Sequence, residues 1–168
     1  SQVPQGRNTN QIDLNGGVAI VSRWPIEQKV QYLFKDEGCG ADAGANKGFA
    51  YAKVNKNGVK FHIIATHTQA EDPLCGGADK GVRQRQFQEI RHWIDGKGIP
   101  LTQELLLIGG DLNVDKSHTE YRQMLKTLNV AEPNYQGHTA TWDPKTNDLV
   151  AFDHGESAPE HLDYVLAD

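Results

Sequence analysis

The segment Leu105 to Val114, which reads Leu-Leu-Leu-Ile-Gly-Gly-Asp-Leu-Asn-Val, constrains the fold of this chain most strongly. Four apolar residues before two glycines predict a strand buried on both faces that ends where the backbone can bend and another group can approach. Because side chains alternate along a strand, Asp111 and Asn113 are expected on one side, with Leu112 on the other. This pair suits a divalent cation, a phosphate, or a water that attacks phosphorus. The alternative is a strand that ends in a plain turn, with Asp111 capping the loop.

Length and charge limit the classes of protein to consider. The chain has 168 residues, enough for a single domain with a substantial core. No stretch has the apolar length of a membrane span, and no signal-peptide pattern follows Ser1, so neither is expected in this sequence. A net charge of −5 disfavours a partner such as nucleic acid, gripped through a basic surface, although a bound metal could supply positive charge.

The two cysteines predict a disulfide. Cys39 and Cys75 both lie beside glycines in loop-like surroundings, whereas a free structural thiol usually lies in an apolar element. The alternative is two free thiols. A disulfide between them would stabilise the fold by roughly 3–4 kcal/mol in the chain-entropy model. It would also imply an oxidising compartment, so we expect a secreted protein.

Hydrophobic patterns and turn signals give the other strands. Residues 1–14 are polar and predict a loop, and a second loop is expected over 38–46. Asn57-Gly58 predicts a hairpin turn, since both residues tolerate positive φ. Strands are predicted at 17–22, 30–34, 48–54, 59–66, 138–142 and 162–167.

Two amphipathic helices complete the pattern. The first is predicted from Val82 to Asp95, ended by Gly96, and the second follows a capping box formed by Ser117 and Glu120. Their apolar residues recur at helical spacing: Val82, Phe87, Ile90, Trp93 and Ile94 in the first, and Tyr121, Met124, Leu125 and Leu128 in the second. Hairpins together with strand–helix–strand units predict one layered α/β domain over residues 1–168, with a site at one rim.

Three further polar residues lie in or after predicted strands. His67 follows a buried strand as Asp111 does; it is either a hydrogen-bonded structural residue or a donor that stabilises charge on a phosphoryl group. Asp163 lies in an otherwise apolar strand, so we expect it to be buried and to need a partner. It would then support a neighbouring site residue or anchor a loop. His62, in the middle of a strand, is expected to face solvent.

Six motifs together resemble the bacterial neutral sphingomyelinases. These motifs are Asn15-Gly-Gly-Val-Ala-Ile-Val-Ser-Arg-Trp-Pro-Ile26, Asn46-Lys-Gly-Phe49, Thr66-His-Thr-Gln-Ala-Glu-Asp72, Gly109-Gly-Asp-Leu-Asn113, Gly137-His-Thr-Ala-Thr-Trp-Asp143 and Leu162-Asp-Tyr-Val165. The resemblance covers nearly the whole chain from about Asn15. The Gly-Asp-Leu-Asn element indicates only the wider endonuclease/exonuclease/phosphatase superfamily, whereas Gln-Ala-Glu-Asp and His-Thr-Ala-Thr-Trp-Asp are more specific to sphingomyelinases.

The resemblance implies a fold and an activity. The fold is a DNase I-like β-sandwich flanked by helices, and the activity is Mg²⁺-dependent hydrolysis of sphingomyelin at a membrane surface to ceramide and phosphocholine. By this likeness Asp111 contacts the metal and orients or deprotonates the attacking water, Asn113 positions the scissile phosphate, and His67 stabilises developing charge. The cysteines that match Cys39 and Cys75 form a disulfide in the secreted bacterial enzymes.

The chain also departs from the family pattern. The family has an earlier strand with an Asn and a metal-binding Glu, and a terminal Asp-His pair preceded by a membrane-entering aromatic hairpin; neither is found in this sequence. Leu14-Asn15 stand where the family often has an acidic pair at a secondary metal site, so that site is not expected. We therefore expect the central part of an enzyme, incomplete at both ends and weak or inactive alone. The alternatives are a DNase-like metal-dependent nuclease and a non-catalytic remnant that binds lipid or phosphate.

Overall fold

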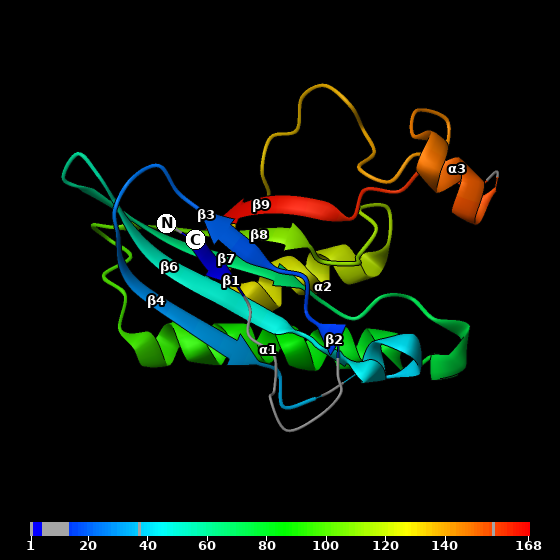
Figure 1. Ribbon diagram of the computed structural model, residues 1–168, viewed down its shortest axis with the longest axis horizontal. Helices are drawn as coiled ribbons and strands as arrows, with labels where there is room; N and C mark the ends of the chain where they lie inside the picture. The colour runs from blue at the N-terminus through cyan, green and yellow to red at the C-terminus, as the bar shows by residue number, and fades with distance from the viewer. Residues whose placement is uncertain (1, 5–13, 37, 156) are drawn as a thin grey trace.

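The computed structural model describes residues 2–4, 14–36, 38–155 and 157–168 (Figure 1). Its strands are β1 (Gln2–Pro4), β2 (Leu14–Asn15), β3 (Ala19–Val21), β4 (Ile26–Leu33), β5 (Ala45–Asn46), β6 (Gly48–Lys56), β7 (Val59–His67), β8 (Leu105–Asp111) and β9 (Asp163–Ala167). Its α-helices are α1 (Asp79–Lys97), α2 (Thr119–Leu128) and α3 (Asp148–His154), and its 3₁₀ turns are η1 (Gly40–Gly44) and η2 (Pro73–Cys75).

The central sheet has the strand order β4-β6-β7-β8-β9. β7 and β8 run parallel, connected through α1, and the other neighbours in this sheet are antiparallel. The carboxyl ends of two parallel strands lie at the same edge of a sheet. His67 and Asp111, the last residues of β7 and β8, are register partners there. The topology therefore brings the two predicted strand-end residues together.

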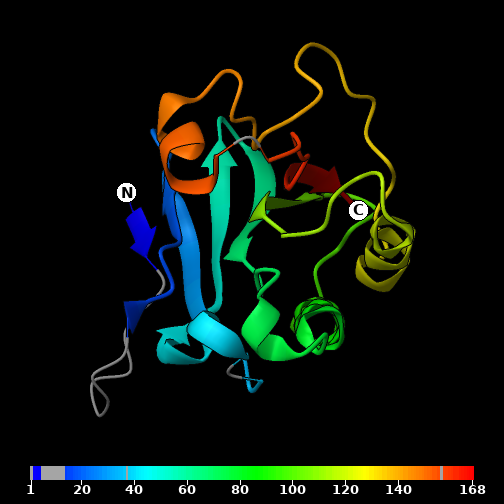
Figure 2. The same ribbon diagram turned by 90° about the vertical axis from the view of Figure 1, so that its right-hand side faces the viewer.

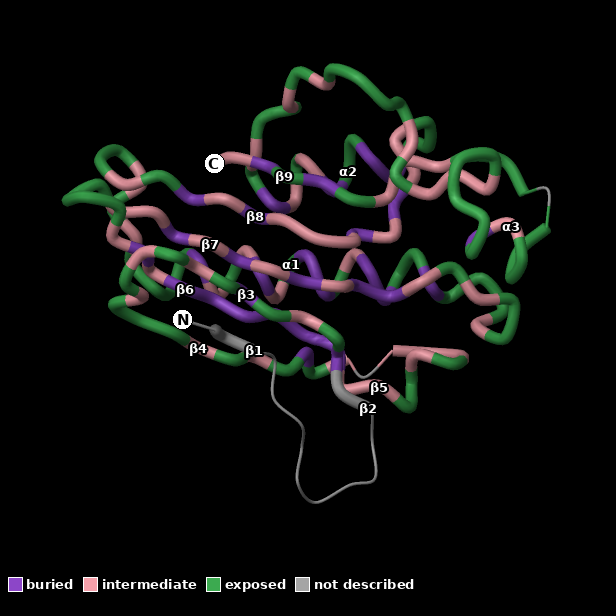
Figure 3. The backbone as a smooth tube through the Cα atoms, turned by 45° about the horizontal axis from the view of Figure 1, so that its top comes forward, coloured by how far each residue is buried: buried purple, intermediate pink, exposed green. Residues whose placement is uncertain are grey.

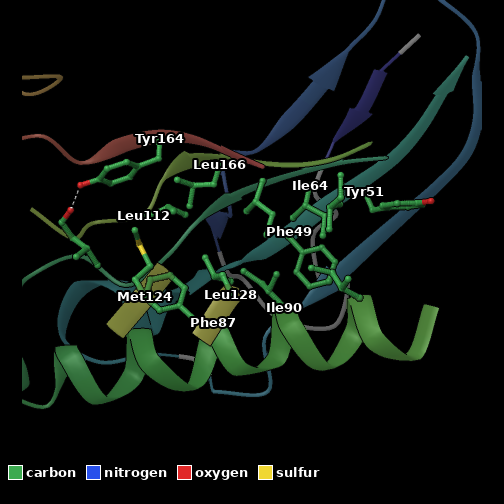
Figure 4. Packing of buried hydrophobic residues seen from close by; sticks show 14 of the residues in the cluster. Phe49, Tyr51, Ile64, Phe87, Ile90, Leu112, Met124, Leu128, Tyr164 and Leu166 are labelled. Atoms are coloured by element: carbon green, nitrogen blue, oxygen red, sulfur yellow. Dashed lines mark hydrogen bonds between the residues drawn. The ribbon is translucent and has the colours of Figure 1, made fainter. Parts of the chain in front are cut away.

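Helices α1 and α2 cover one face of this sheet (Figure 2). Alternation along β6 directs Phe49 and Tyr51 to the helices and Ala50 and Ala52 to the opposite face. The core between the sheet and the helices is formed by large apolar side chains with almost no exposed area, including Phe49, Tyr51, Ile64, Phe87, Ile90, Leu112, Met124, Leu128, Tyr164 and Leu166 (Figure 4).

The opposite face of the sheet packs against β3, which pairs with β1 in an antiparallel register. Ile20 of β3 contacts a smaller cluster that contains Ala50, Ala52 and Val54. Small side chains on this face let the backbone of β3 approach closely. The central sheet is therefore covered by helices α1 and α2 on one face and by strand β3 on the other.

The predicted strands form except the one at 138–142, and several details differ. β8 is not buried on both faces: Leu106 and Ile108 are buried, whereas Leu105 is 41% exposed. Residues 138–142 form no strand, and Trp142 makes only an isolated bridge to Glu160. The hairpin turn is confirmed, with positive φ at both of its central residues, Asn57 and Gly58.

The predicted loops also contain short elements. Within residues 1–14, β1 pairs with β3 and β2 begins at Leu14; residues 1 and 5–13 lie outside the described residues. Within 38–46, η1 and β5 form. β1, β2 and β5 have two or three residues each in segments without an apolar run, so the sequence pattern did not indicate them.

The first helix extends beyond both of its predicted ends. α1 continues through Gly96 to Lys97, and Gly98, with φ of 67°, forms the left-handed cap. The capping box before α2 is wrong: His118 occupies the N-cap without a side-chain hydrogen bond, and the Glu120 carboxylate binds Arg83 instead. None of the helices in the described ranges is long and apolar enough to span a bilayer.

His62 does not face solvent as expected. It is 3% exposed, and its ring lies between the Tyr51 hydroxyl, 2.8 Å from Nδ1, and a Glu104 carboxylate oxygen, 2.6 Å from Nε2. Glu104 precedes β8 in the sequence but lies beside β7 in space. A partner 42 residues away explains why a polar side chain is stable on the helix-covered face of the strand.

The predicted disulfide is confirmed. Cys39 and Cys75 are bonded, with their Cα atoms 5.3 Å apart. The bond joins the segment before η1 to η2, which follows β7. It therefore lies close in sequence to the loop after His67.

Candidate active site

His67 and Asp111 face each other at the rim of the sheet. Their nearest atoms, Nε2 of His67 and Oδ2 of Asp111, are 3.7 Å apart, beyond a direct hydrogen bond. Their side chains are 41% and 34% exposed, so both can reach a ligand from solvent. Pairing of β7 with β8 sets this spacing.

Gly110 permits the close approach of the two strands. Its φ is 129°, and a Cβ at this position would lie 2.0 Å from the carbonyl oxygen of Thr66. The group that approaches Gly110 is thus the backbone of β7. Any side chain at position 110 would push the two strands apart next to His67 and Asp111.

Asp111 and Asn113 lie together, but by a turn rather than by alternation. Asn113 has a left-handed backbone with φ of 49°, and its N–H donates to Oδ1 of Asp111 at 2.9 Å. Its side-chain Nδ2 donates to the carbonyl oxygen of Thr68 at 2.9 Å. Leu112 points into the core, fully buried, as the sequence predicted.

Thr68 connects the ends of the two strands. Its N–H donates to the Asp111 carbonyl at 3.1 Å, and its hydroxyl donates to the Leu112 carbonyl at 2.7 Å. With the bond from Asn113, three hydrogen bonds join Thr68 to the loop after β8. The ends of β7 and β8, which carry His67 and Asp111, are therefore held as one unit.

Lys47 is a site residue that analysis of single residues missed. It is 5% exposed, and its Nζ lies 2.6 Å from the Thr68 carbonyl oxygen and 2.7 Å from Oδ2 of Asp42. Lys47 stands directly before the apolar strand β6. The sequence indicated this lysine only as part of the motif Asn46-Lys-Gly-Phe49. A charged residue at that position has to be buried with a partner.

Burial and charge set opposite pKa shifts in the central pair. Burial, and then the Lys47 ammonium, lower the pKa of His67, while Asp111 opposes this shift. Burial raises the pKa of Asp111, opposed by the Asn113 N–H and by His67. The local environment thus favours a neutral imidazole and makes the Asp111 carboxylate more basic than an exposed one.

Asp163 is exposed, which corrects the expectation of burial. β9 is an edge strand whose Tyr164 and Leu166 face the core, so Asp163 points the other way. It is the register partner of Asp111, and its charge contributes to the raised pKa of that residue. Asp163 therefore lies at the same rim, and its support of Asp111 stays a prediction.

The carboxylates at this rim fit one type of metal site. Among the described residues, no group of three or more His, Cys, Asp or Glu side chains could enclose an ion. Mg²⁺ is often held by one or two carboxylates, with waters and substrate phosphate oxygens completing its shell. Asp111, with Asp163 beside it on β9, offers that kind of open arrangement.

The arrangement has the parts needed to cleave a phosphodiester. A carboxylate of raised basicity can orient a water, the Asn113 amide can donate to a phosphate oxygen, and the His67 ring can donate to charge that develops on the other side. The structure brings together the predicted His67, Asp111 and Asn113, with Asp163 beside them.

Comparisons with known proteins give a family and several relatives. The model of the endonuclease/exonuclease/phosphatase family matches residues 5–168. A curated relative named sphingomyelinase C, from Leptospira interrogans, is 55% identical over 152 residues, which is 90% of this chain and 27% of that protein. A relative named phospholipase C, from Staphylococcus aureus, is 47% identical over 165 residues, or 98% of this chain and 49% of that protein.

A solved structure gives the same similarity in three dimensions. A mutant of beta toxin from Staphylococcus aureus with bound magnesium ions is 49% identical, with a TM-score of 0.87 over 91% of this chain and 52% of that one. The chain thus spans half or less of the length of the two curated relatives. The similarity extends over nearly all of the chain, including the rim that carries the candidate site.

Proposed function

Because the chain belongs to the endonuclease/exonuclease/phosphatase family, we propose that it carries the phosphodiesterase site of a sphingomyelinase. The reaction is hydrolysis of sphingomyelin to ceramide and phosphocholine. The observation that carries the proposal is the meeting of His67, Asp111 and Asn113 at the paired ends of β7 and β8. The name of the relative at 55% identity, sphingomyelinase C, supports the choice of substrate.

Asp111, Asn113 and His67 each have a separate role in the reaction. Asp111 orients the water and accepts its proton as the water oxygen bonds to phosphorus. Asn113 holds the phosphate through its amide, and the His67 ring stabilises charge on the phosphoryl oxygens. The bond from phosphorus to the ceramide oxygen breaks, and that oxygen takes up a proton as ceramide leaves.

Mg²⁺ is the proposed cofactor, with Asp111 as one of its ligands. Support comes from the open carboxylate arrangement at the rim and from the magnesium ions in the similar beta toxin structure. When bound, Mg²⁺ would neutralise charge on the phosphate and lower the pKa of bound water. Asp163 supports Asp111 through its position on the adjacent strand.

The charge around the site favours a choline phospholipid over nucleic acid. Four acidic residues, Glu71, Asp115, Glu120 and Glu160, and two basic ones, Lys80 and Arg83, line a small cavity next to Asn113. Burial, and then Asp115 and Glu71, raise the pKa of Glu160, as expected where carboxylates crowd together. Arg83 is paired with Glu120, so the other three carboxylates outnumber Lys80. This excess of negative charge attracts a quaternary ammonium group and repels the phosphates that flank a cleavage site in DNA.

The proposed partner is a phosphocholine-bearing membrane surface, met outside the cell. α3 lies beyond the edge at which β7 and β8 end (Figure 1), within an exposed stretch of chain (Figure 3). Its Leu149 and Phe152 are 70% and 86% exposed, three residues apart on one side of the helix. The disulfide supports a secreted protein.

The test is Mg²⁺-dependent phosphocholine release from sphingomyelin vesicles. The protein is assayed at its natural length, with EDTA-treated protein and Asp111→Asn as inactive controls, and with double-stranded DNA as competing substrate. Release that stops on chelation is expected. Cleavage of DNA without release would support the nuclease, and vesicle binding without turnover would support a non-catalytic remnant.

A further inference from the structure

A single peptide group, between Thr68 and Gln69, contacts both Asn113 and Lys47 of the site. Its carbonyl oxygen accepts from Asn113 Nδ2 at 2.9 Å and from Lys47 Nζ at 2.6 Å. Its N–H, on the opposite side of the planar group, donates to Oε1 of Gln86 on α1 at 2.9 Å. Helix α1, which lies outside the rim, thus binds the N–H side of a peptide whose carbonyl accepts from two site residues.

Gln86 is an unusual residue for its place in the core. It is fully buried, and its Nε2 has no hydrogen-bond partner among the described residues. A buried amide that satisfies only one of its two ends destabilises a fold, and an apolar residue of similar size would avoid that cost. The Gln69 N–H requires an acceptor, which fixes the orientation of the amide with Oε1 toward it. Gln86 is therefore explained by the one hydrogen bond it makes.

We propose that Gln86 is a positioning residue that fixes the plane of the Thr68–Gln69 peptide and so aims the Thr68 carbonyl at Asn113 and Lys47. Because the N–H and C=O of a trans peptide point in opposite directions, holding one direction holds the other. Donation from the N–H also polarises the peptide and strengthens its carbonyl as an acceptor. The catalytic consequence rests on the proposed phosphodiesterase function.

The neighbouring contacts leave this task to Gln86. The preceding peptide is held by the Thr68 N–H, which donates to Asp111, and the following one by the Gln69 carbonyl, which accepts from Arg83 Nη1 at 3.1 Å. Neither contact holds the N–H of the peptide between them. Arg83 and Gln86 lie one turn apart on α1, so one helical face holds two consecutive peptide groups.

The test compares three variants. Gln86→Met keeps the size and removes the acceptor, and Gln86→Glu keeps an acceptor oxygen. Gln84→Met is the matched control, since Gln84 lies on the same helix and donates to Thr127 at 2.6 Å, away from the rim. Two readouts are used, both in the protein at its natural length: kcat and KM for phosphocholine release, and the NMR resonance of the Asn113 side-chain amide.

We expect Gln86→Met to lower kcat about 10- to 100-fold with little change in KM, the scale on which misplaced catalytic groups act, and to shift the Asn113 amide resonance. Gln86→Glu should retain both the kcat and the resonance, as should Gln84→Met. An unshifted Asn113 resonance in folded Gln86→Met, or equal kcat losses for Gln86→Met and Gln84→Met, would overturn the proposal. If Gln86→Met does not fold, a folded Gln86→Glu with a displaced resonance overturns it and an unchanged one supports it. Wild-type protein without turnover would contradict the phosphodiesterase function, while the resonance still tests the positioning role.

Discussion

Oδ2 of Asp111 lies 3.7 Å from Nε2 of His67, and the two residues are register partners at the ends of parallel strands. The pair is therefore placed by backbone pairing and not by a hydrogen bond between the side chains. A ligand group can contact both side chains without first breaking a bond between them. Backbone pairing therefore sets the spacing of the two residues, while both side chains stay available to a ligand.

Replacing Asp111 with Asn should abolish most turnover without destabilising the fold. The variant loses the proton acceptor, and general-base catalysis is worth about 10²–10⁴-fold in rate. Because burial disfavours the charged carboxylate and Asn keeps an oxygen for the Asn113 N–H, the Tm should stay equal or rise. Phosphocholine release and calorimetry measure the two effects. Activity within tenfold of wild type would contradict the role of Asp111.

Stability should fall in mildly acidic solution because of His67. Its folded pKa lies below that of an exposed histidine, so below about pH 6.5 the unfolded chain binds a proton that the folded chain does not. The stability contributed by the neutral ring is complete above this pH and is lost as the pH falls through the folded pKa. Urea unfolding across this range in EDTA should show a shallower loss for His67→Gln. His138→Gln, at an exposed histidine, is the control.

Breaking the buried ion pair between α1 and α2 should cost more than removing it. Arg83 donates through Nε and Nη2 to the two carboxylate oxygens of Glu120, at 2.7 and 2.8 Å. Arg83→Met leaves the Glu120 carboxylate buried without its partner and should lower the free energy of unfolding by about 3–5 kcal/mol, whereas Glu120→Leu should cost less because Arg83 keeps Asp79 at 3.4 Å. The double variant should lose clearly less than the sum of the two, in a urea double-mutant cycle. Additive losses would contradict this coupling.

Removing the disulfide should destabilise the protein by roughly 3–4 kcal/mol in the chain-entropy model. The bond joins residues separated by 36 positions, and the Gln69 side chain bonds the backbone of Cys39 beside it. Urea unfolding of the Cys39→Ser, Cys75→Ser double variant measures the effect. A reducing agent should weaken the wild type to the same extent and leave the double variant unchanged.

The exposed apolar residues of α3 should contribute to vesicle binding. Leu149→Ser and Phe152→Ser remove apolar area worth about 1.5–3 kcal/mol per buried side chain, so together they should weaken binding to sphingomyelin vesicles at least about tenfold. Vesicle sedimentation measures binding, and hydrolysis of a soluble phosphodiester should be unaffected. Val21→Ser on β3, 71% exposed in the wild type, is the matched control. Equal binding by all three variants would exclude α3 as a contact.

Local patterns predicted most of the scaffold. β8, α1 and the Asn57-Gly58 hairpin follow from apolar runs, helical spacing and turn chemistry, all of which lie within a few residues. The strand ends at His67 and Asp111 were also predicted, and their pairing was then set by the parallel register. The site residues could thus be named before their distance was known.

The missed features all depend on partners far away in the sequence. His62 is buried because Glu104 bonds it, Glu120 turns from its own helix end to Arg83, and Lys47 reaches the Thr68 carbonyl. Each is a polar side chain satisfied by a group at least 21 positions away. A pattern along one segment carries no information on such a contact, because the contact exists only after the sheet and helices have packed.

The close contact at Gly110 limits which amino-acid substitutions this protein can tolerate. A Cβ there would meet the Thr66 carbonyl oxygen at 2.0 Å, so the width of the site depends on the absence of one carbon atom. Every nonsynonymous base change in a glycine codon adds that carbon or stops translation. No mutation at this codon is a conservative one, and random mutagenesis should return only synonymous changes there among active clones.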